Sequence, residues 1–317
     1  MSTPKYRHIV IPEAGDGMRL DRILSRWFHH LSRSAMARHL KQGLVTDDEG
    51  RVLRPSTRVR AQQGVRVYIP GIAPTGTPPP MPRVLFEDDR LAVVYKPAGM
   101  VAHPAGPVHQ WSVIGLAKTH WPEHSVDLVH RLDKDTSGCL VLSKDQDANL
   151  ALKDAFRTRD TRKEYVGVVR GRPEWDSLTV RAPIGRAGGP IRVQMAVQED
   201  GLSARTDVAV TLRGQPGEGS WVRCVLHTGR THQIRVHLAH VGHPLLGDLL
   251  YGLPLAQALA VKETGVTPAL RQASGAPRQA LHAQLLGFPH PSGGRVEVEA
   301  PIPPEFERWR CEEMSPD

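Results

Sequence analysis

The chain of 317 residues has little of several features that define common protein classes. Its three cysteines, Cys139, Cys224 and Cys311, are an odd number spread far apart, which argues against a disulfide framework and indicates a reducing compartment. No run approaches the ~18 uncharged apolar residues of a membrane-spanning helix. The first residues carry Lys5 and Arg7 but lack the apolar stretch of a secretory signal. We therefore expect a cytoplasmic protein that does not enter a membrane.

Positive charge is present in excess, and it is unevenly distributed. The net charge is +8, yet residues 1–70 hold 13 Lys and Arg against 6 Asp and Glu, a net charge of +7. The remaining residues, 71–317, therefore carry only +1. A small module this basic is typical of proteins that bind nucleic acid or an anionic surface, although a well-solvated surface has the same composition.

A proline-rich segment separates the basic part from the rest. Residues 71–82 (GIAPTGTPPPMP) contain five prolines and no charge, a composition that favours an extended, semi-rigid linker. We predict a first domain over residues 1–70, a linker over 71–82 and a second domain over 83–317.

The first domain has the pattern of two short helices followed by short strands. Apolar residues recur at helical spacing from Leu20 to Leu31, and Trp27 and Phe28 lie on that stripe, so both are expected in the core. Ser32 and Gly43 bound a second helix. Basic side chains fall outside the stripe and form the candidate RNA-binding surface: Arg19, Arg22, Arg33, Arg38 and Lys41.

The second domain mixes strands and helices without regular alternation. Short apolar runs predict strands at 90–95, 139–143, 165–169 and 221–226, and helical patterns occur at 112–119, 145–158 and 231–241. We therefore expect a mixed, largely antiparallel sheet of the α+β class. Residues 253–276 are weakly patterned and are interpreted as an inserted surface loop that can include one helix.

The block HRLDKDTSG at residues 130–138 is the first candidate site. Asp133 lies between Arg131 and Lys134, directly before an apolar strand. Neighbouring cations favour the ionised form of a carboxylate, which can then act as a nucleophile or a base. A solvated turn would have similar residues. A kinase catalytic loop is excluded, because Leu132 breaks the HRD pattern and neither a G-x-G-x-x-G loop nor DFG is present.

The block HTGRTHQIRVHLAHVGHPLLG at residues 227–247 is the second. Arg230 lies at a predicted strand-to-helix turn, where a guanidinium can pair with a carboxylate. His237, His240 and His243 suggest a metal site, but their spacing is loose and the H-E-x-x-H carboxylate is missing, so we expect no metal. Tyr165, in Lys163-Glu164-Tyr165 at the start of a strand, suits either stacking on a flat ligand or a place in the core.

These patterns resemble two known families, one in each predicted domain. Residues 19–69 resemble an S4 domain, a small α/β RNA-binding module, through RLD, SRS and the Gly-Leu-Val turn into a strand. They depart from it at residues 47–50, where an acidic turn replaces the usual Asn-Gly and weakens one edge of the RNA surface. Residues 83–310 are similar to the RluA-type pseudouridine synthases, through this ordered series of blocks: YKPAGMVAHP, HRLDKDTSG, KEY, LHTGRTHQIRVHLAHVGHPLLGD, RQALHA and APIP.

The second resemblance, together with the S4-like part, implies the RluC/RluD-like branch, which converts uridine to pseudouridine in large-subunit ribosomal RNA. It implies an isomerase with the pseudouridine synthase fold, no cofactor and no metal. Asp133 takes the place of the catalytic aspartate, Arg230 of the arginine that pairs with it, and Tyr165 of the tyrosine that stacks on the target base. Arg131, next to His130, takes the place of the residue that displaces the target nucleotide.

The substrate then expected is ribosomal RNA, free or within an assembling subunit. The protein is expected to be a monomer, because the sequence has no coiled coil and no other evident oligomerisation element. Three alternatives stay open: a synthase acting on transfer RNA, an S4-bearing RNA-binding protein with an inert second domain, and a metal-dependent hydrolase built on the histidines.

Overall fold

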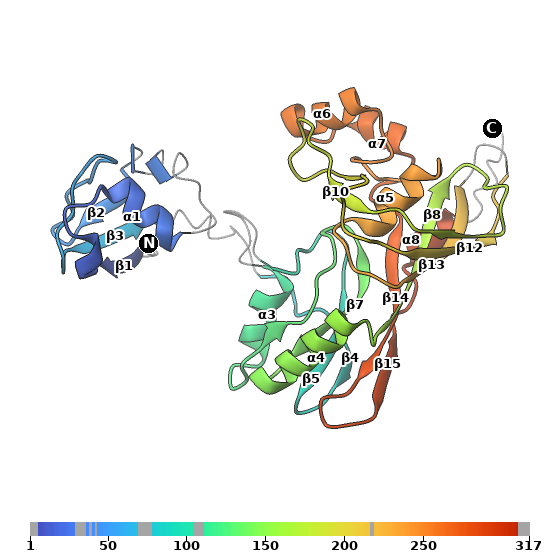
Figure 1. Ribbon diagram of the computed structural model, residues 1–317, viewed down its shortest axis with the longest axis horizontal. Coiled ribbons are helices and arrows are strands. Elements are labelled where there is room, and N and C mark those ends of the chain that lie inside the picture. The colour runs from blue at the N-terminus through green and yellow to red at the C-terminus, as the bar shows by residue number, and fades with distance from the viewer. Residues whose placement is uncertain are drawn as a thin grey trace. The chain divides into compact units, whose positions relative to one another are not determined.

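The computed structural model describes residues 6–28, 36–37, 40–41, 43–68, 78–103, 111–215 and 219–309 (Figure 1). The chain forms two compact units that adjoin in the sequence at Pro79 and Pro80. Each unit has its own hydrophobic core and is considered by itself. Most of the predicted linker lies outside the described residues, so the division at residues 71–82 stays a prediction. Within the described ranges, no helix is long and apolar enough to cross a membrane.

The first unit is a small sheet covered by short helices. Its strands are β1 (Tyr6–Val10), β2 (Val45–Asp47) and β3 (Gly64–Tyr68), which form an antiparallel sheet of order β1-β3-β2. A short 3-10 helix, η1 (Glu13–Gly15), precedes α1 (Leu20–Trp27), which buries Leu20, Ile23 and Leu24 against the sheet.

Of the two aromatic residues expected in the core of this unit, Trp27 and Phe28, one is buried and the other is partly exposed. Phe28 is buried, as expected, but Trp27 is 36% exposed, because α1 ends at Trp27 and it is Phe28 that turns into the core. The second predicted helix, from Ser32 to Gly43, lies mostly outside the described residues.

The second unit is built on one large mixed sheet. Among the strands that the structure describes, one pairing is parallel, that between β7 and β14, and the others are antiparallel, so the predicted mixed, largely antiparallel α+β class is confirmed. The strands run in the order β4 (Val84–Glu87), β5 (Leu91–Lys96), β7 (Ser137–Ser143), β14 (Leu281–Pro289), β8 (Arg162–Arg170), β13 (Gly219–Leu226), β12 (Thr206–Leu212) and β9 (Ser177–Val180), with β6 (Asp127–Leu128) beside β7 and β15 (Arg295–Glu299) beside β14.

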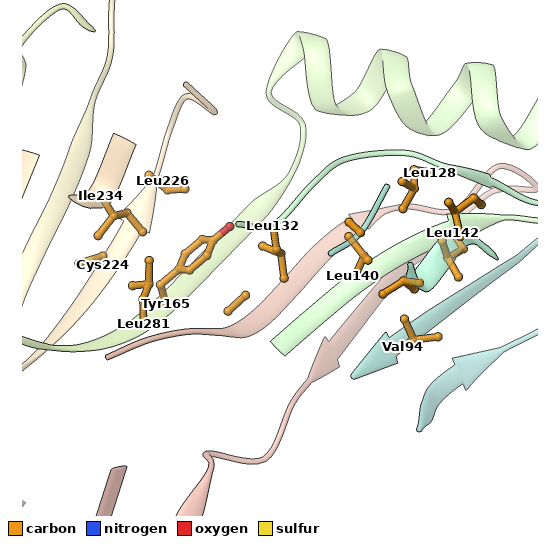
Figure 2. Close-up of a cluster of buried hydrophobic side chains, with 14 of the residues drawn as sticks. Val94, Leu128, Leu132, Leu140, Leu142, Tyr165, Cys224, Leu226, Ile234 and Leu281 are labelled. Carbon is orange, nitrogen blue, oxygen red and sulfur yellow. The ribbon is translucent and has the colours of Figure 1, made fainter. Parts of the chain in front are cut away.

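Alternate residues of the strands point to opposite faces of the sheet, and a helix covers each face. On one face, Val94 and Leu140 pack with α3 (Val113–His120), in a cluster that continues to Tyr165 (Figure 2). On the other face, Val141 packs with Leu152 of α4 (Gln146–Thr158). The strands are buried on both faces, which is why they are nearly continuous apolar runs in the sequence.

Two further elements lie near the end of β13, namely α5 (Gln233–His240) and the hairpin of β10 (Ile184–Arg186) and β11 (Met195–Val197). The short helix α8 (Pro304–Arg308) instead packs Phe306 against Trp221 near the start of β13. The weakly patterned segment contains two helices, α6 (Leu255–Thr264) and α7 (Pro268–Ser274), rather than one. Thr267 caps α7 with its side chain, accepting a hydrogen bond from Leu270 N, a local signal that the apolar pattern does not carry.

Candidate active site

The loop that carries Asp133 connects β6 to β7, and a lysine of β5 holds it by a hydrogen bond to its backbone. The side chain of Lys96 is fully buried, and its ammonium donates hydrogen bonds to the carbonyls of Pro97 (2.9 Å), Met100 (2.7 Å) and Lys134 (2.9 Å). Burial lowers the pKa of Lys96 to about 7. The YKPAG block is therefore a support for the loop, because it fixes the carbonyl next to Asp133.

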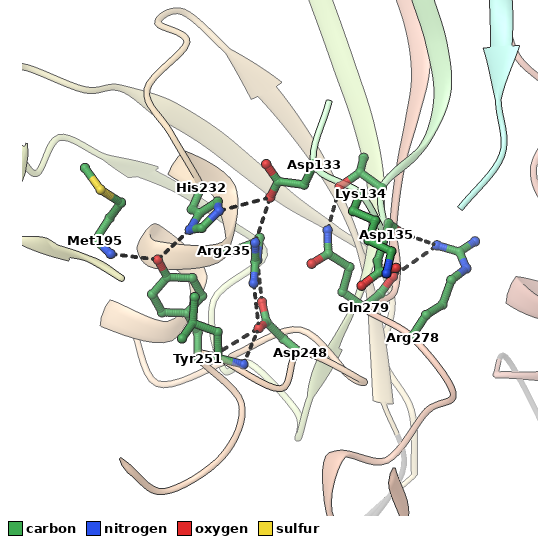
Figure 3. Close-up of polar contacts among 12 residues, drawn as sticks. Asp133, Lys134, Asp135, Met195, His232, Arg235, Asp248, Tyr251, Arg278 and Gln279 are labelled. Atoms are coloured by element: carbon green, nitrogen blue, oxygen red, sulfur yellow. Dashed lines mark hydrogen bonds and ion pairs between the residues drawn. The ribbon is translucent and has the colours of Figure 1, made fainter. Parts of the chain in front are cut away.

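A second support comes from residues 278–283, the RQALHA block. Arg278 donates to the carbonyl of Asp135 (3.1 Å), and Gln279 Nε2 donates to Thr136 Oγ1 (2.6 Å) (Figure 3). Side chains near the end of the chain thus hold the backbone and a hydroxyl of a loop about 140 residues earlier.

The close approach of β7 and β14 explains the glycine that ends the HRLDKDTSG block. Gly138 has a φ of +117° and pairs with Ala283 in parallel register. A Cβ at this position would lie 2.1 Å from the carbonyl oxygen of Ala283. Only glycine combines this backbone conformation with this contact.

Asp133 is joined to a buried charged network. Arg235 Nη1, from α5, donates to Asp133 Oδ2 at 2.7 Å. Two other nitrogens of the same guanidinium bind Asp248, Nε to Oδ2 at 2.7 Å and Nη2 to Oδ1 at 3.0 Å. Burial opposes the charge of Arg235, but Asp248 and Asp133 outweigh it and raise the pKa of the guanidinium. Asp248 therefore fixes a permanently charged arginine whose remaining edge points at Asp133 (Figure 3).

The prediction that Arg230 pairs with Asp133 is wrong. The arginine that pairs with this carboxylate is Arg235. Arg230 lies in the turn before α5, and its Nε donates to the carbonyl of Ser203 at 3.0 Å. Arg235 lies one turn further on, where the helix is enclosed and its side chain is buried between two carboxylates. Asp248, the last residue of the HPLLGD block, could have indicated Arg235 in the sequence, because a buried arginine needs a carboxylate beside it.

His232 lies on the other side of Asp133 and is linked to Tyr251. His232 Nε2 is 3.8 Å from Asp133 Oδ2, and its Nδ1 is 2.8 Å from the Tyr251 hydroxyl. That hydroxyl also accepts a hydrogen bond from Met195 N (2.9 Å). Burial lowers the pKa of His232 and raises that of Tyr251 to about 12. Burial therefore favours the neutral imidazole, whose Nε2 lies on the side of Asp133.

A small pocket of about 100 Å³ opens above these groups. Asp133, Tyr165 and Arg131 line it together, and Arg230 contributes to its rim. Tyr165 comes from β8 and is mostly buried among Leu132, Leu226 and Ile234 (Figure 2). Among the described residues, Asp133 Oδ1 has no hydrogen bond or ion pair, so this oxygen is available to a molecule in the pocket.

His130 does not line this pocket. The prediction that it helps to displace the target base is therefore replaced by a structural role. Its Nε2 accepts a hydrogen bond from Val141 N (3.2 Å), and its ring stacks on Phe156 with centroids 4.7 Å apart. The residue therefore turns its ring toward the sheet and α4, while the next residue, Arg131, is exposed at the pocket.

Of the three histidines that suggested a metal, His237 and His243 have other partners. His237 is fully buried, with Nδ1 2.9 Å from Thr206 Oγ1 and Nε2 2.9 Å from the carbonyl of Ala182. No group of three metal-ligating side chains occurs in the part of the chain that the structure describes.

The predicted RNA surface of the first unit is described only in part. Arg19 binds Asp21 through two nitrogens (3.0 and 3.2 Å), whereas Arg22 and Lys41 are exposed. Arg33 and Arg38 lie outside the described residues. The acidic turn is part of this unit's surface, where Asp48 accepts hydrogen bonds from His8 (2.9 Å) and Arg66 (3.2 Å).

The site therefore defines an enzyme that works through a carboxylate beside a buried arginine, at the end of a mixed sheet. Residues 90–240 match the family model described as RNA pseudouridylate synthase. The "Ribosomal large subunit pseudouridine synthase D" of Xanthomonas campestris pv. campestris is 36% identical over 95% of this chain and 91% of its own length. An "Uncharacterized RNA pseudouridine synthase" of Chloroflexus aurantiacus is 38% identical over 95% of this chain and 92% of its own.

A solved structure with the same fold is "Human RNA Pseudouridylate Synthase Domain Containing 1". Its TM-score is 0.58 at 24% identity, and the match covers 74% of this chain and 90% of the human one. The chain belongs to the RNA pseudouridine synthase family, as the sequence blocks predicted.

Proposed function

We propose that this protein isomerises uridines of large-subunit ribosomal RNA to pseudouridine, with Asp133 as the catalytic residue. The observation that carries the proposal is the free Asp133 Oδ1 above a buried arginine, in a pocket that also holds Tyr165. The name of the Xanthomonas campestris relative, which this chain matches over 91% of its length, supports ribosomal RNA as the substrate.

In this reaction the N1–C1′ bond of the uridine breaks and a C5–C1′ bond forms. The proton on C5 is lost to solvent and N1 gains one, so no outside reactant is consumed. The departing uracil carries negative charge away and leaves positive charge on the sugar. Asp133 Oδ1 acts on the sugar, either by attack at C1′ or by removal of the C2′ proton, and both routes begin at the same oxygen.

Arg235 and His232 keep Asp133 ready for that step. Arg235 Nη1 and the more distant His232 Nε2 are both directed at Oδ2, so the carboxylate is oriented through one oxygen and reacts through the other. Because Asp248 holds the opposite edge of Arg235, the guanidinium does not have to reorganise during the reaction.

The target base must leave its RNA stack to reach this pocket, at a cost of about a few kcal/mol. Tyr165 stacks on the extruded base, and the exposed Arg131 occupies the place that the base leaves, which offsets part of that cost. The basic first unit, as an S4-like domain, supplies further phosphate contacts through Arg19, Arg22, Arg33, Arg38 and Lys41. We propose that the enzyme acts in the cytoplasm as a monomer, on free RNA or on an assembling subunit.

The deciding experiment is tritium release from RNA labelled at uracil C5, using unmodified large-subunit ribosomal RNA and bulk transfer RNA in parallel. Asp133→Asn keeps the shape of the side chain but removes its charge. We expect it to lower release by on the order of a thousandfold or more while RNA binding stays within a few-fold of wild type. Asp147→Asn, the same change at an exposed carboxylate of α4, is the matched control and is expected to be fully active.

Substantial activity of Asp133→Asn would overturn the catalytic assignment. Release from transfer RNA alone would keep the reaction and replace the substrate. Release from neither RNA calls for the same assay on immature ribosomal particles, and the absence of release there as well would refute the proposed activity.

A further inference from the structure

A second, larger pocket lies at the same edge of the sheet, where β13 ends and β8 begins. Its volume is about 500 Å³. Four arginines line it, Arg159, Arg162, Arg181 and Arg205, and no carboxylate does. The second domain has a net charge of only +1, so this concentration of positive charge is local rather than a property of the domain as a whole.

Two of these arginines are neutralised from outside the pocket. Arg162 pairs with Glu164 at 2.8 Å, and Arg205 pairs with Asp207 at 3.0 Å. Burial raises the pKa of Asp207, but hydrogen bonds from Arg205 and His227 outweigh it and lower that pKa to about 2. This carboxylate therefore stays charged and holds Arg205 at every physiological pH.

The other two arginines, Arg159 and Arg181, are exposed and form no ion pair with any described residue. Arg159 ends α4 in the left-handed conformation, with a φ of +67°. Glycine or asparagine is favoured there, and another residue costs about 1 kcal/mol.

The basic pocket shares walls with the catalytic pocket. Leu226 lines both. Thr228, in the basic pocket, donates a hydrogen bond from Oγ1 to Gln233 Oε1 in the catalytic pocket (2.7 Å). The carbonyl of Ser203, in the basic pocket, accepts the hydrogen bond from Arg230 Nε at the catalytic rim. A strand of RNA that places a base over Tyr165 therefore passes directly beside the basic pocket.

We propose that this pocket binds backbone phosphates of the RNA next to the target uridine, with Arg159 and Arg181 as the contacting residues. The inference rests on the proposed function, because RNA is the anion it requires. A guanidinium matches the oxygens of a phosphate with two parallel hydrogen bonds, and two such groups without a carboxylate partner attract a polyanion. The pocket thus fixes the RNA strand on one side of the reacting nucleotide.

The test measures the affinity for unmodified large-subunit ribosomal RNA as a function of salt concentration, on the full chain. Each lost phosphate contact makes the slope of log K against log salt shallower by about 0.7–0.9. The double variant Arg159→Ala, Arg181→Ala is expected to make that slope shallower by about 1.5 and to weaken binding about tenfold near 0.15 M salt.

Two variants separate charge from position. Arg172→Ala removes an exposed arginine beyond the far end of the nine-residue strand β8, roughly 30 Å away, and should leave the slope unchanged. Arg159→Lys with Arg181→Lys keeps both charges and should keep the slope near that of wild type. An unchanged slope in the double alanine variant, with a fold verified by thermal unfolding, would overturn the proposal. Failure of wild type to release tritium would instead refute the proposed function, because the salt measurement needs no turnover.

Discussion

At the scale of single residues, the hydrogen bonds around Asp133 determine where its neighbours keep their protons. The Tyr251 hydroxyl accepts from Met195 N and lies 2.8 Å from His232 Nδ1. We expect it to donate its own proton to Nδ1, which would place the imidazole proton on Nε2, on the side of Asp133. Tyr251 does not touch the pocket that holds Asp133. It is a positioning residue, because it reaches the carboxylate through His232, by its hydroxyl, and through Arg235, whose guanidinium lies 5.0 Å from the centre of its ring.

Tyr251→Phe removes that proton and leaves the rest of the ring in place. We expect kcat to fall about tenfold, the equivalent of one hydrogen bond of about 1.4 kcal/mol, with KM changed less than twofold. Nitrogen NMR of the histidine rings is the direct measurement. His232 should carry its proton on Nε2 in wild type and should show a mixture of both neutral forms in the variant.

His232→Gln identifies the His232 signals by their loss from the spectrum. A wild-type His232 with its proton on Nδ1 would contradict this arrangement. An unchanged kcat in Tyr251→Phe would show that the orientation of the imidazole has no part in the reaction.

At the scale of elements, the sequence predicted the strands and helices whose formation depends on residues close together in the chain. The strands that became β5, β7, β8 and β13 are apolar enough to be recognised alone, and Asp145 caps α4 within the predicted helix. The sequence did not distinguish Arg235 from Arg230, because the choice depends on which side chain reaches a carboxylate 102 residues away. Helices α6 and α7 were missed since their apolar residues do not form one clear stripe.

The junction of β14 with β7 makes stability depend on pH through His282. This histidine is fully buried, and burial lowers its pKa to about 4, against about 6.5 in an unfolded chain. Between these two values the unfolded state binds a proton that the folded state does not, so stability falls as the pH falls. The loss is about 1.4 kcal/mol per pH unit, or about 2 kcal/mol at pH 5.

Denaturant unfolding at pH 7 and pH 5 tests this dependence. His282→Gln is expected to be less stable than wild type at pH 7, because the bond to Ser137 (2.9 Å) is altered, but to lose about 2 kcal/mol less on acidification. Equal losses in the two proteins would assign the acid sensitivity to other groups.

At the scale of the whole molecule, charge and chemistry belong to different parts of the chain. Residues 1–70 carry +7 of the net +8, and Asp133 and its partners all belong to the second unit. Removing residues 1–70 is therefore expected to weaken RNA binding and to flatten its salt dependence, while single turnover at saturating enzyme is retained.

Binding of labelled ribosomal RNA at several salt concentrations, by the full chain and by residues 71–317, measures this effect. The clusters of buried side chains in the second unit contain no residue of the first, so its core is complete without it. Thermal unfolding of the shortened protein verifies that it is folded. A salt slope unchanged by the truncation would assign RNA affinity to the second unit.

The position of β14 has a consequence for how the enzyme is made. This strand lies between β7 and β8 in the sheet, yet it is synthesised after both, and Arg278 and Gln279, just before it, hold the loop of Asp133. Proteins emerge from the ribosome N-terminus first, so a growing chain exposes its basic first unit long before residue 281 leaves the exit tunnel. Until then β7 and β8 have no strand between them, and the loop of Asp133 lacks the hydrogen bonds from Arg278 and Gln279. We therefore expect a chain that terminates before residue 278 to be unable to modify RNA, even where its basic first unit is folded.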